Sequence, residues 1–123
     1  MNGIVHHVGA LGYTATLAAY KDGKPWHNAL VDYLRLNRDH VENSLAPHTQ
    51  LKTYHSEATY LTWIDARQMN VENPSEYFEN FGVGIYDGTP FGAPGFLRLN
   101  FACPRVMLSE ALSRIQRGLD ALD

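Results

Sequence analysis

The sequence has few of the residues that would place it in the common disulfide, metal or nucleic-acid-binding classes. Its single cysteine, Cys103, excludes an internal disulfide bond and a thiolate metal cage, and favours a reducing, cytoplasmic location. The ten Lys and Arg residues are scattered and the formal net charge is -3, so no basic stripe is available to neutralise a phosphate backbone. Nucleic acid is therefore not an expected partner.

Motifs of hydrolases, metalloenzymes and nucleotide-binding proteins are also missing. The six histidines contain no HExxH spacing, and His6 and His7 are neighbours whose side chains diverge on a helix, so no metal site is predicted. No GxSxG, GxxxxGK or GxGxxG pattern occurs, which argues against a serine hydrolase and a phosphate-binding loop.

The sequence lacks a hydrophobic run long enough to cross a membrane. Residues 4–20 carry no charge apart from His6 and His7, but they have no basic leader and are shorter than the roughly 20 residues of a spanning helix. We read this run as a helix that is buried against protein, either a missing upstream partner or a second copy in a homo-oligomer. No membrane interaction is expected.

What is present is the composition of a folded domain. The 123 residues are 45% hydrophobic and 19% charged, which is enough for one core, although a fragment of a longer chain is equally compatible with it. The predicted order is helix, long helix, two strands, short helix, short strand, loop, strand and helix. This order predicts an α+β fold in which helices pack on a small, mostly antiparallel sheet.

Turn-forming residues set the predicted boundaries of these elements. Gly23 ends the first helix, Pro25 suits the first turn of a long helix over residues 26–46, and Pro47 ends that helix. The strands are predicted at residues 50–54 and 58–65, and in the stretch after Gly95. The loop at 87–95 contains too many glycines and prolines for a regular element.

The most informative stretch is GFLRLNFACPR at 95–105, which places Arg98 in an otherwise apolar strand. Alternation along the strand puts Leu97, Leu99 and Phe101 on a core face and Arg98 on the opposite face. The guanidinium is suited to fork-like pairing with a carboxylate. An ordinary salt bridge is the simplest interpretation, with Asp65 as a candidate partner of Arg98 or of Arg67.

Four stretches in one order resemble a known family. They are LGYTATLAAYKDGKPW at 11–26, YLRLNRDHV at 33–41, EATYLTWIDAR at 57–67 and YDGTPFGAPGFLRLNFACPR at 86–105. Together they are similar to the C-terminal portion of pyridoxal-phosphate-dependent enzymes of fold type I, in the cystathionine β-lyase or C–S lyase group related to the class I and II aminotransferases. The resemblance covers nearly the whole chain.

The resemblance implies a role for Arg98. In this family the arginine of the small-domain sheet binds the α-carboxylate of the amino-acid substrate, and Arg98 matches it. Candidate residues that line the substrate entrance are Tyr60, Phe91, Gly92 and Asn100. Residues 1–25 would be the helical end of the large domain, and residues 26–123 the long connecting helix with the small C-terminal α+β domain.

The resemblance also implies what the chain does not contain. The family's serine-flanked lysine, which forms the Schiff base with pyridoxal phosphate, lies upstream of every matched stretch, and Lys21, Lys24 and Lys52 do not match its position. We therefore expect no catalytic residue in this chain, no cofactor bound to it alone, and no activity alone. Lyase and aminotransferase share the carboxylate-binding arginine, so this choice stays open. The alternative is a non-enzymatic α+β module that binds a protein or a small carboxylate.

Overall fold

A computed structural model describes residues 9–122 and divides the chain into two compact units, Met1–Tyr33 and Leu34–Asp123. The division falls inside the long helix. The predicted assignment of residues 1–25 to the end of a large domain stays a prediction. No helix in the described part of the chain is long and apolar enough to cross a lipid bilayer.

The first unit contains α1 (Ala10–Asp22) and the start of α2 (Lys24–Leu45). Gly23 separates them as predicted: its N–H donates to the Ala19 carbonyl, and a Cβ at this position would collide with that oxygen. Pro25 then occupies the first turn of α2, where its missing N–H costs nothing. None of the described residues of α1 is buried, although the helix carries Leu11, Leu17 and Tyr20.

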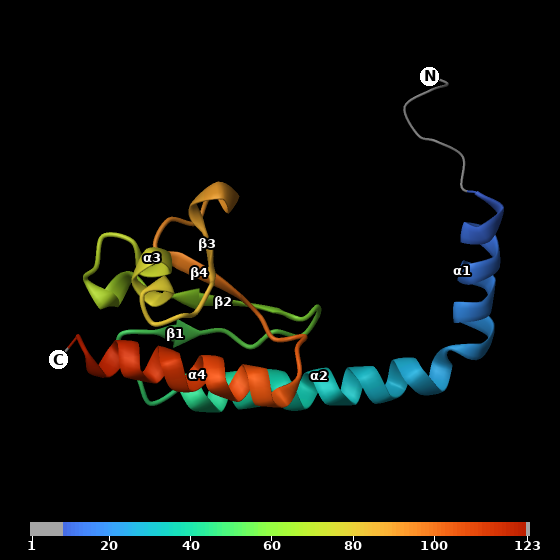
Figure 1. The fold of residues 1–123 in the computed structure, drawn as a ribbon, viewed down its shortest axis with the longest axis horizontal. Helices are drawn as coiled ribbons and strands as arrows, with labels where there is room; N and C mark the ends of the chain where they lie inside the picture. Colours follow the sequence, from blue (N-terminus) through green and yellow to red (C-terminus); the bar gives the residue numbers. More distant parts are fainter. Residues whose placement is uncertain (1–8, 123) are drawn as a thin grey trace, which may run out of the picture. The chain divides into compact units, whose positions relative to one another are not determined.

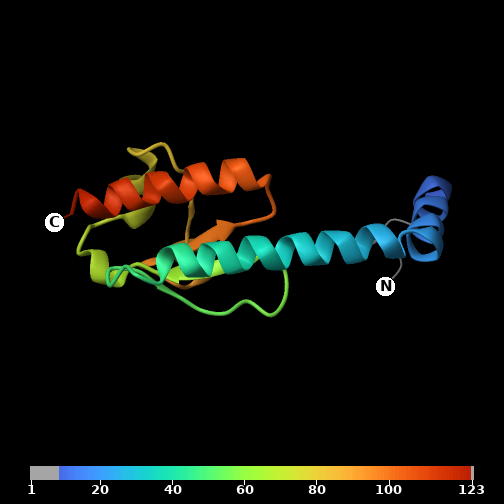
Figure 2. The same ribbon diagram turned by 90° about the horizontal axis from the view of Figure 1, so that it is seen from below.

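The second unit is built on a four-stranded antiparallel sheet, which confirms the predicted α+β fold. The strands lie in the order β1 (Lys52–Thr53), β2 (Leu61–Asp65), β4 (Phe96–Asn100) and β3 (Tyr86–Asp87). Figure 1 and Figure 2 show the end of α2 and the C-terminal helix α4 (Arg105–Asp120) side by side along the sheet, and a His40 to Ser109 hydrogen bond of 3.0 Å joins them.

Shorter elements complete the second unit. The short helix α3 (Pro74–Glu79) is the predicted short helix, and it begins after Asn73, whose side chain accepts hydrogen bonds from the N–H groups of Ser75 and Glu76. Two 3-10 turns were not predicted: η1 (Arg67–Met69) follows β2, and η2 (Thr89–Phe91) lies within the glycine-rich loop. Turns this short leave no hydrophobic periodicity in a sequence.

The core lies between the sheet and the helices, and β4 alternates as predicted. Leu97, Leu99 and Phe101 are buried, whereas Phe96 and Arg98 are half-buried and belong to the other face. The buried positions of α4 follow a helical stripe and consist of Leu108, Leu112, Ile115, Gly118 and Leu119.

One polar residue of this core was not predicted. Asn37, on the inner face of α2, is fully buried, and its Nδ2 donates to the carbonyl oxygens of Phe101 at 2.8 Å and Cys103 at 3.0 Å. These carbonyls lie just beyond β4, where the chain leaves the sheet for α4. The side chain of Asn37 therefore fixes the exit of β4 to the long helix.

Replacing Asn37 tests this role. Asn37→Leu leaves two carbonyls without their donor, each at a cost of about 1–3 kcal/mol, but it also removes the buried Oδ1 of Asn37, which has no hydrogen-bond partner. We therefore expect it to lower the free energy of unfolding by about 2–4 kcal/mol. Urea denaturation measures the effect. Asn80→Leu, which removes an exposed amide at the end of α3, is the control and should change stability by no more than about 0.5 kcal/mol. Equal effects of the two substitutions would contradict the role of Asn37.

Candidate functional site

The site is built on the face of the sheet that points away from α2 and α4. Arg98 lies in β4 between two neighbours, directly opposite Trp63 of β2 on one side and Tyr86 of β3 on the other. Residues directly opposite one another in antiparallel strands point to the same face. Backbone pairing alone therefore places one guanidinium between two aromatic side chains.

Aromatic rings surround the charge of Arg98. Its Cζ lies 4.3 Å from the centre of the Phe91 ring and 5.0 Å from that of Tyr86, both within cation–π range. Trp63 meets Phe91 edge to face, with 5.8 Å between ring centres. The cation is thus held by π faces.

The salt bridge considered for Arg98 does not form. Asp65 pairs with Arg67, which donates from Nε to Oδ1 at 2.9 Å and from Nη2 to Oδ2 at 2.7 Å. Within residues 9–122, Arg98 forms no ion pair and no hydrogen bond, and its Nε is buried without an acceptor. The reason is local: Arg67 lies two residues from Asp65, and its backbone N–H also donates to that carboxylate.

The pairing perturbs the titration of Asp65. Hydrogen bonds from the Arg67 side chain are the largest cause that holds the pKa of the Asp65 carboxyl below its ordinary value, and partial burial opposes them. Arg67 also lies over the Phe96 ring at 4.9 Å. Arg67 is therefore paired with a carboxylate of its own chain, whereas Arg98 has no such partner within residues 9–122.

The predicted lining residues are not all beside Arg98. Phe91 contacts it directly, and Gly92 follows Phe91 with a φ of 77°, the left-handed conformation that ends η2. Asn100 follows Arg98 on the same strand face, and its Oδ1 accepts from the N–H of Ala102 at 2.8 Å. Tyr60 pairs its carbonyl with the N–H of Phe101, which places it in the alternation of Thr62 and Ile64 rather than that of Trp63. Its role at an entrance stays a prediction.

Trp63 and Tyr86 are the site residues that the sequence analysis missed. Alternation separates Tyr60 from Trp63, but it does not say which of them faces Arg98, because that depends on the register of β2 against β4. Tyr86 belongs to a two-residue strand too short to show a pattern. Tyr86 and Phe91 precede Arg98 closely in the sequence, and this clustering was the signal from which an aromatic surrounding of Arg98 could have been predicted.

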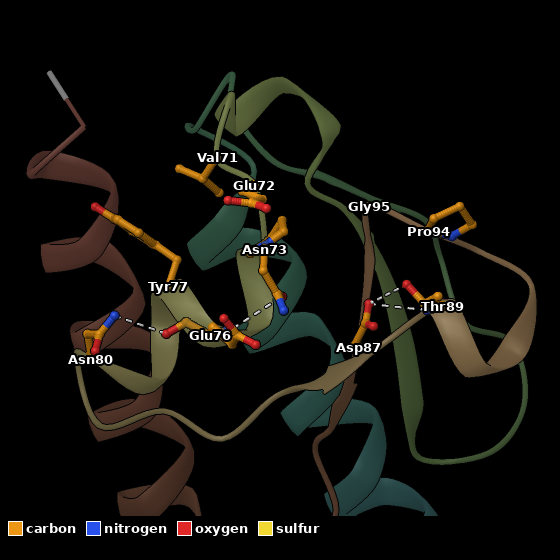
Figure 3. A pocket seen from close by; sticks show the side chains of 11 residues that line it. Val71, Glu72, Asn73, Glu76, Tyr77, Asn80, Asp87, Thr89, Pro94 and Gly95 are labelled. Atoms are coloured by element: carbon orange, nitrogen blue, oxygen red, sulfur yellow. Dashed lines mark hydrogen bonds between the residues drawn. The ribbon is translucent and has the colours of Figure 1, made fainter.

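A pocket of 610 Å³ lies elsewhere in the second unit, between the start of α3 and the loop that follows β3 (Figure 3). Figure 3 shows Glu72 and Glu76 on one side of it, and Asp87 hydrogen-bonded to Thr89 on the other. Its lining contains these three carboxylates and no Lys or Arg. An anionic group would be repelled there, so we place the site at Arg98 and not in this pocket.

Other candidate chemistry has little support in the described part of the chain. No group of three or more His, Cys, Asp or Glu side chains comes together there as a metal site, and His6 and His7 lie outside it. Burial raises the pKa of the Cys103 thiol, which disfavours the reactive thiolate.

Comparison with known proteins gives a consistent set of relatives. Residues 2–115 match the family model described as aminotransferase class I and II. A cystathionine beta-lyase of Corynebacterium glutamicum is 36% identical over 88% of this chain, and the match covers 30% of that enzyme.

Solved structures agree. The crystal structure of OvoB is 42% identical, with a TM-score of 0.91 over 96% of this chain and 31% of its own. The pyridoxal-phosphate-bound C–S lyase of Staphylococcus hominis is 34% identical, with a TM-score of 0.80 over 93% of this chain and 30% of its own. The chain thus spans about a third of the length of the relatives it matches.

The partner of Asp65 can be tested by titration. Because Arg67 lowers the pKa of Asp65 in the folded chain, the pair stabilises the fold above the ordinary Asp pKa, and this contribution is lost as the pH falls through the lowered value. We expect Arg67→Met to raise the pKa of Asp65 towards its ordinary value, whereas Arg98→Met leaves it unchanged. Carbon-13 NMR titration of the Asp65 carboxyl measures its pKa in both variants. A raised pKa of Asp65 in Arg98→Met but not in Arg67→Met would contradict Arg67 as its partner.

Proposed function

We propose, because this chain belongs to the class I and II aminotransferase family, that it is the substrate-carboxylate-binding C-terminal part of a pyridoxal-phosphate-dependent C–S lyase. The observation that carries the proposal is Arg98, a guanidinium that lies on a sheet between aromatic rings and has no carboxylate partner within residues 9–122. A lyase rather than an aminotransferase is favoured by the relatives named cystathionine beta-lyase and C–S lyase.

The role of Arg98 in such an enzyme follows from its surroundings. A planar guanidinium can donate two parallel hydrogen bonds to a carboxylate, which fixes the orientation as well as the position of the bound molecule. A strand with neighbours on both sides is a rigid support for this group. Arg98 would therefore hold an amino-acid substrate by its α-carboxylate and leave its other substituents directed away from the sheet.

We expect the described residues not to hold pyridoxal phosphate by themselves. The cofactor needs a lysine for its aldehyde, and Lys52, the one lysine in the sheet, lies in β1 with β2 between it and the Arg98 strand. Its Nζ lies over the Tyr54 ring at 5.1 Å. When bound, the cofactor supplies the electron sink for cleavage at the substrate α-carbon. Residues outside this chain would bind it.

Helix α1 supports the proposal that a larger protein surrounds this chain. Its residues Leu11, Leu17 and Tyr20 are 85, 68 and 88% exposed, and Trp26, at the start of α2, is 69% exposed. The apolar residues of α1 do not gather on one side, and a helix that is apolar all round is normally enclosed by protein. Residues that correspond to the two thirds of the relatives' length not spanned by this chain would provide this enclosure. Association between copies of the chain, which the sequence analysis expects, stays a proposal.

The enzymatic part of the proposal is tested on the complete reading frame. We expect the frame to continue upstream of Met1 into a serine-flanked lysine, and the complete protein with pyridoxal phosphate to release pyruvate from cystathionine. The 123-residue chain alone should release none and should show no lysine that borohydride traps with the cofactor. A stop codon directly upstream, or a cofactor adduct on the chain alone, would contradict the proposal. Amino transfer without pyruvate would make the parent an aminotransferase.

The binding role of Arg98 is tested on the chain itself. L-Alanine should shift the guanidinium NMR signals of Arg98, whereas L-alaninamide, which has no carboxylate, should not. Arg98→Met should weaken L-alanine binding by about 10- to 100-fold, the loss expected for hydrogen bonds between charged groups. Arg117→Met, the same charge change on an exposed position of α4, is the matched control. Equal weakening of L-alanine binding by both substitutions would show that the effect comes from net charge and not from the position of Arg98, and would contradict the proposed role.

A further inference from the structure

Arg98 is not equally accessible at all of its nitrogens. Its Nε is buried and has no hydrogen-bond acceptor, whereas Nη1 and Nη2 are not among the buried unpartnered atoms of the described residues. Because Arg98 donates no hydrogen bond within residues 9–122, its two Nη groups are the ones that reach solvent. A carboxylate from outside can therefore meet the end of the guanidinium and not its Nε side.

Phe91 is the ring closest to this guanidinium. Its centre lies 4.3 Å from Cζ of Arg98, nearer than the 5.0 Å of Tyr86, and Trp63 packs edge to face against it. Arginine burial without an acceptor is unfavourable, and ring faces offset part of that cost by attracting the cation. Phe91 lies in η2 and not in a strand, so its contact with Arg98 does not follow from the strand register alone.

Hydrogen bonds and a tight glycine position hold the loop that carries Phe91. Asp87 accepts hydrogen bonds from the N–H and the hydroxyl of Thr89, at 3.2 and 3.1 Å. Gly88 donates to the Phe96 carbonyl at 2.8 Å, and any Cβ there would collide with the carbonyl oxygens of Ala93 and Phe96. The turn is therefore tied to the start of β4, the strand that carries Arg98.

We propose that Phe91 is a positioning residue that covers Nε of Arg98 and restricts carboxylate binding to the two Nη groups, in an end-on geometry. This inference rests on the proposed binding role of Arg98. It adds a prediction that the role alone does not make: removing the ring should free the Nε side, so that the guanidinium is more solvated and less uniquely oriented.

The test measures hydrogen exchange at Nε–H of Arg98 by NMR, together with L-alanine binding. Phe91→Leu should accelerate the exchange and weaken binding, each by about 2- to 30-fold, the range of cation–π contributions. Phe91→Tyr, which keeps the ring, should restore both. Tyr54→Leu removes a ring of similar exposure, 47% against 51%, that covers Lys52 instead, and should change neither.

The outcomes separate the two proposals. Unchanged exchange and unchanged binding in Phe91→Leu, with binding lost in Arg98→Met, would overturn the role of Phe91 and keep that of Arg98. L-Alanine binding that survives in Arg98→Met would overturn the proposed function, even if Phe91→Leu accelerates exchange. If Phe91→Leu loosened the whole loop, hydrogen exchange at the Gly88 N–H would rise together with exchange at Nε–H of Arg98. Phe91→Tyr decides this case, because an Nε–H exchange rate that stays high in this variant would contradict the proposal.

Discussion

The alternation of β4 is the constraint on which the rest of the second unit depends. Leu97, Leu99 and Phe101 close the core on one face, so Arg98 must point to the other face, away from α2 and α4. The same strand has β2 and β3 as neighbours, which holds Arg98 between Trp63 and Tyr86. A slip of one residue in this strand would expose the core leucines and bury the charge, so hydrophobic burial enforces the placement of the site.

The two arginines on this face differ because of their carboxylate neighbours. Arg67 has Asp65 two residues away and is paired with it through two side-chain hydrogen bonds, whereas Arg98 is met by the rings of Phe91 and Tyr86. A paired arginine has little reason to bind another anion, because the internal carboxylate is already in place. Aromatic faces hold the cation without neutralising it, and so preserve its attraction for a carboxylate from outside.

Much of this arrangement could be predicted from the sequence, for identifiable reasons. Strand alternation around Arg98 and the break at Gly23 are local features, and the structure confirms them. The partner of Asp65, the face of Trp63 and the buried Asn37 depend on register and on contacts between distant segments, which a local pattern does not contain. The family resemblance predicts Arg98 as a site residue and Phe91 as a lining residue, but it does not predict Trp63 or Tyr86 beside Arg98.

The most direct test of this account is a crystal structure of the chain grown with L-alanine. The account predicts one carboxylate at the Nη groups of Arg98, with N to O distances of about 2.7–2.9 Å, as is typical of charge-assisted hydrogen bonds. Phe91 should still cover Nε, and Asp65 should still pair with Arg67. An Arg98 that pairs with a carboxylate of its own chain, or an L-alanine bound only away from it, would contradict the central claim.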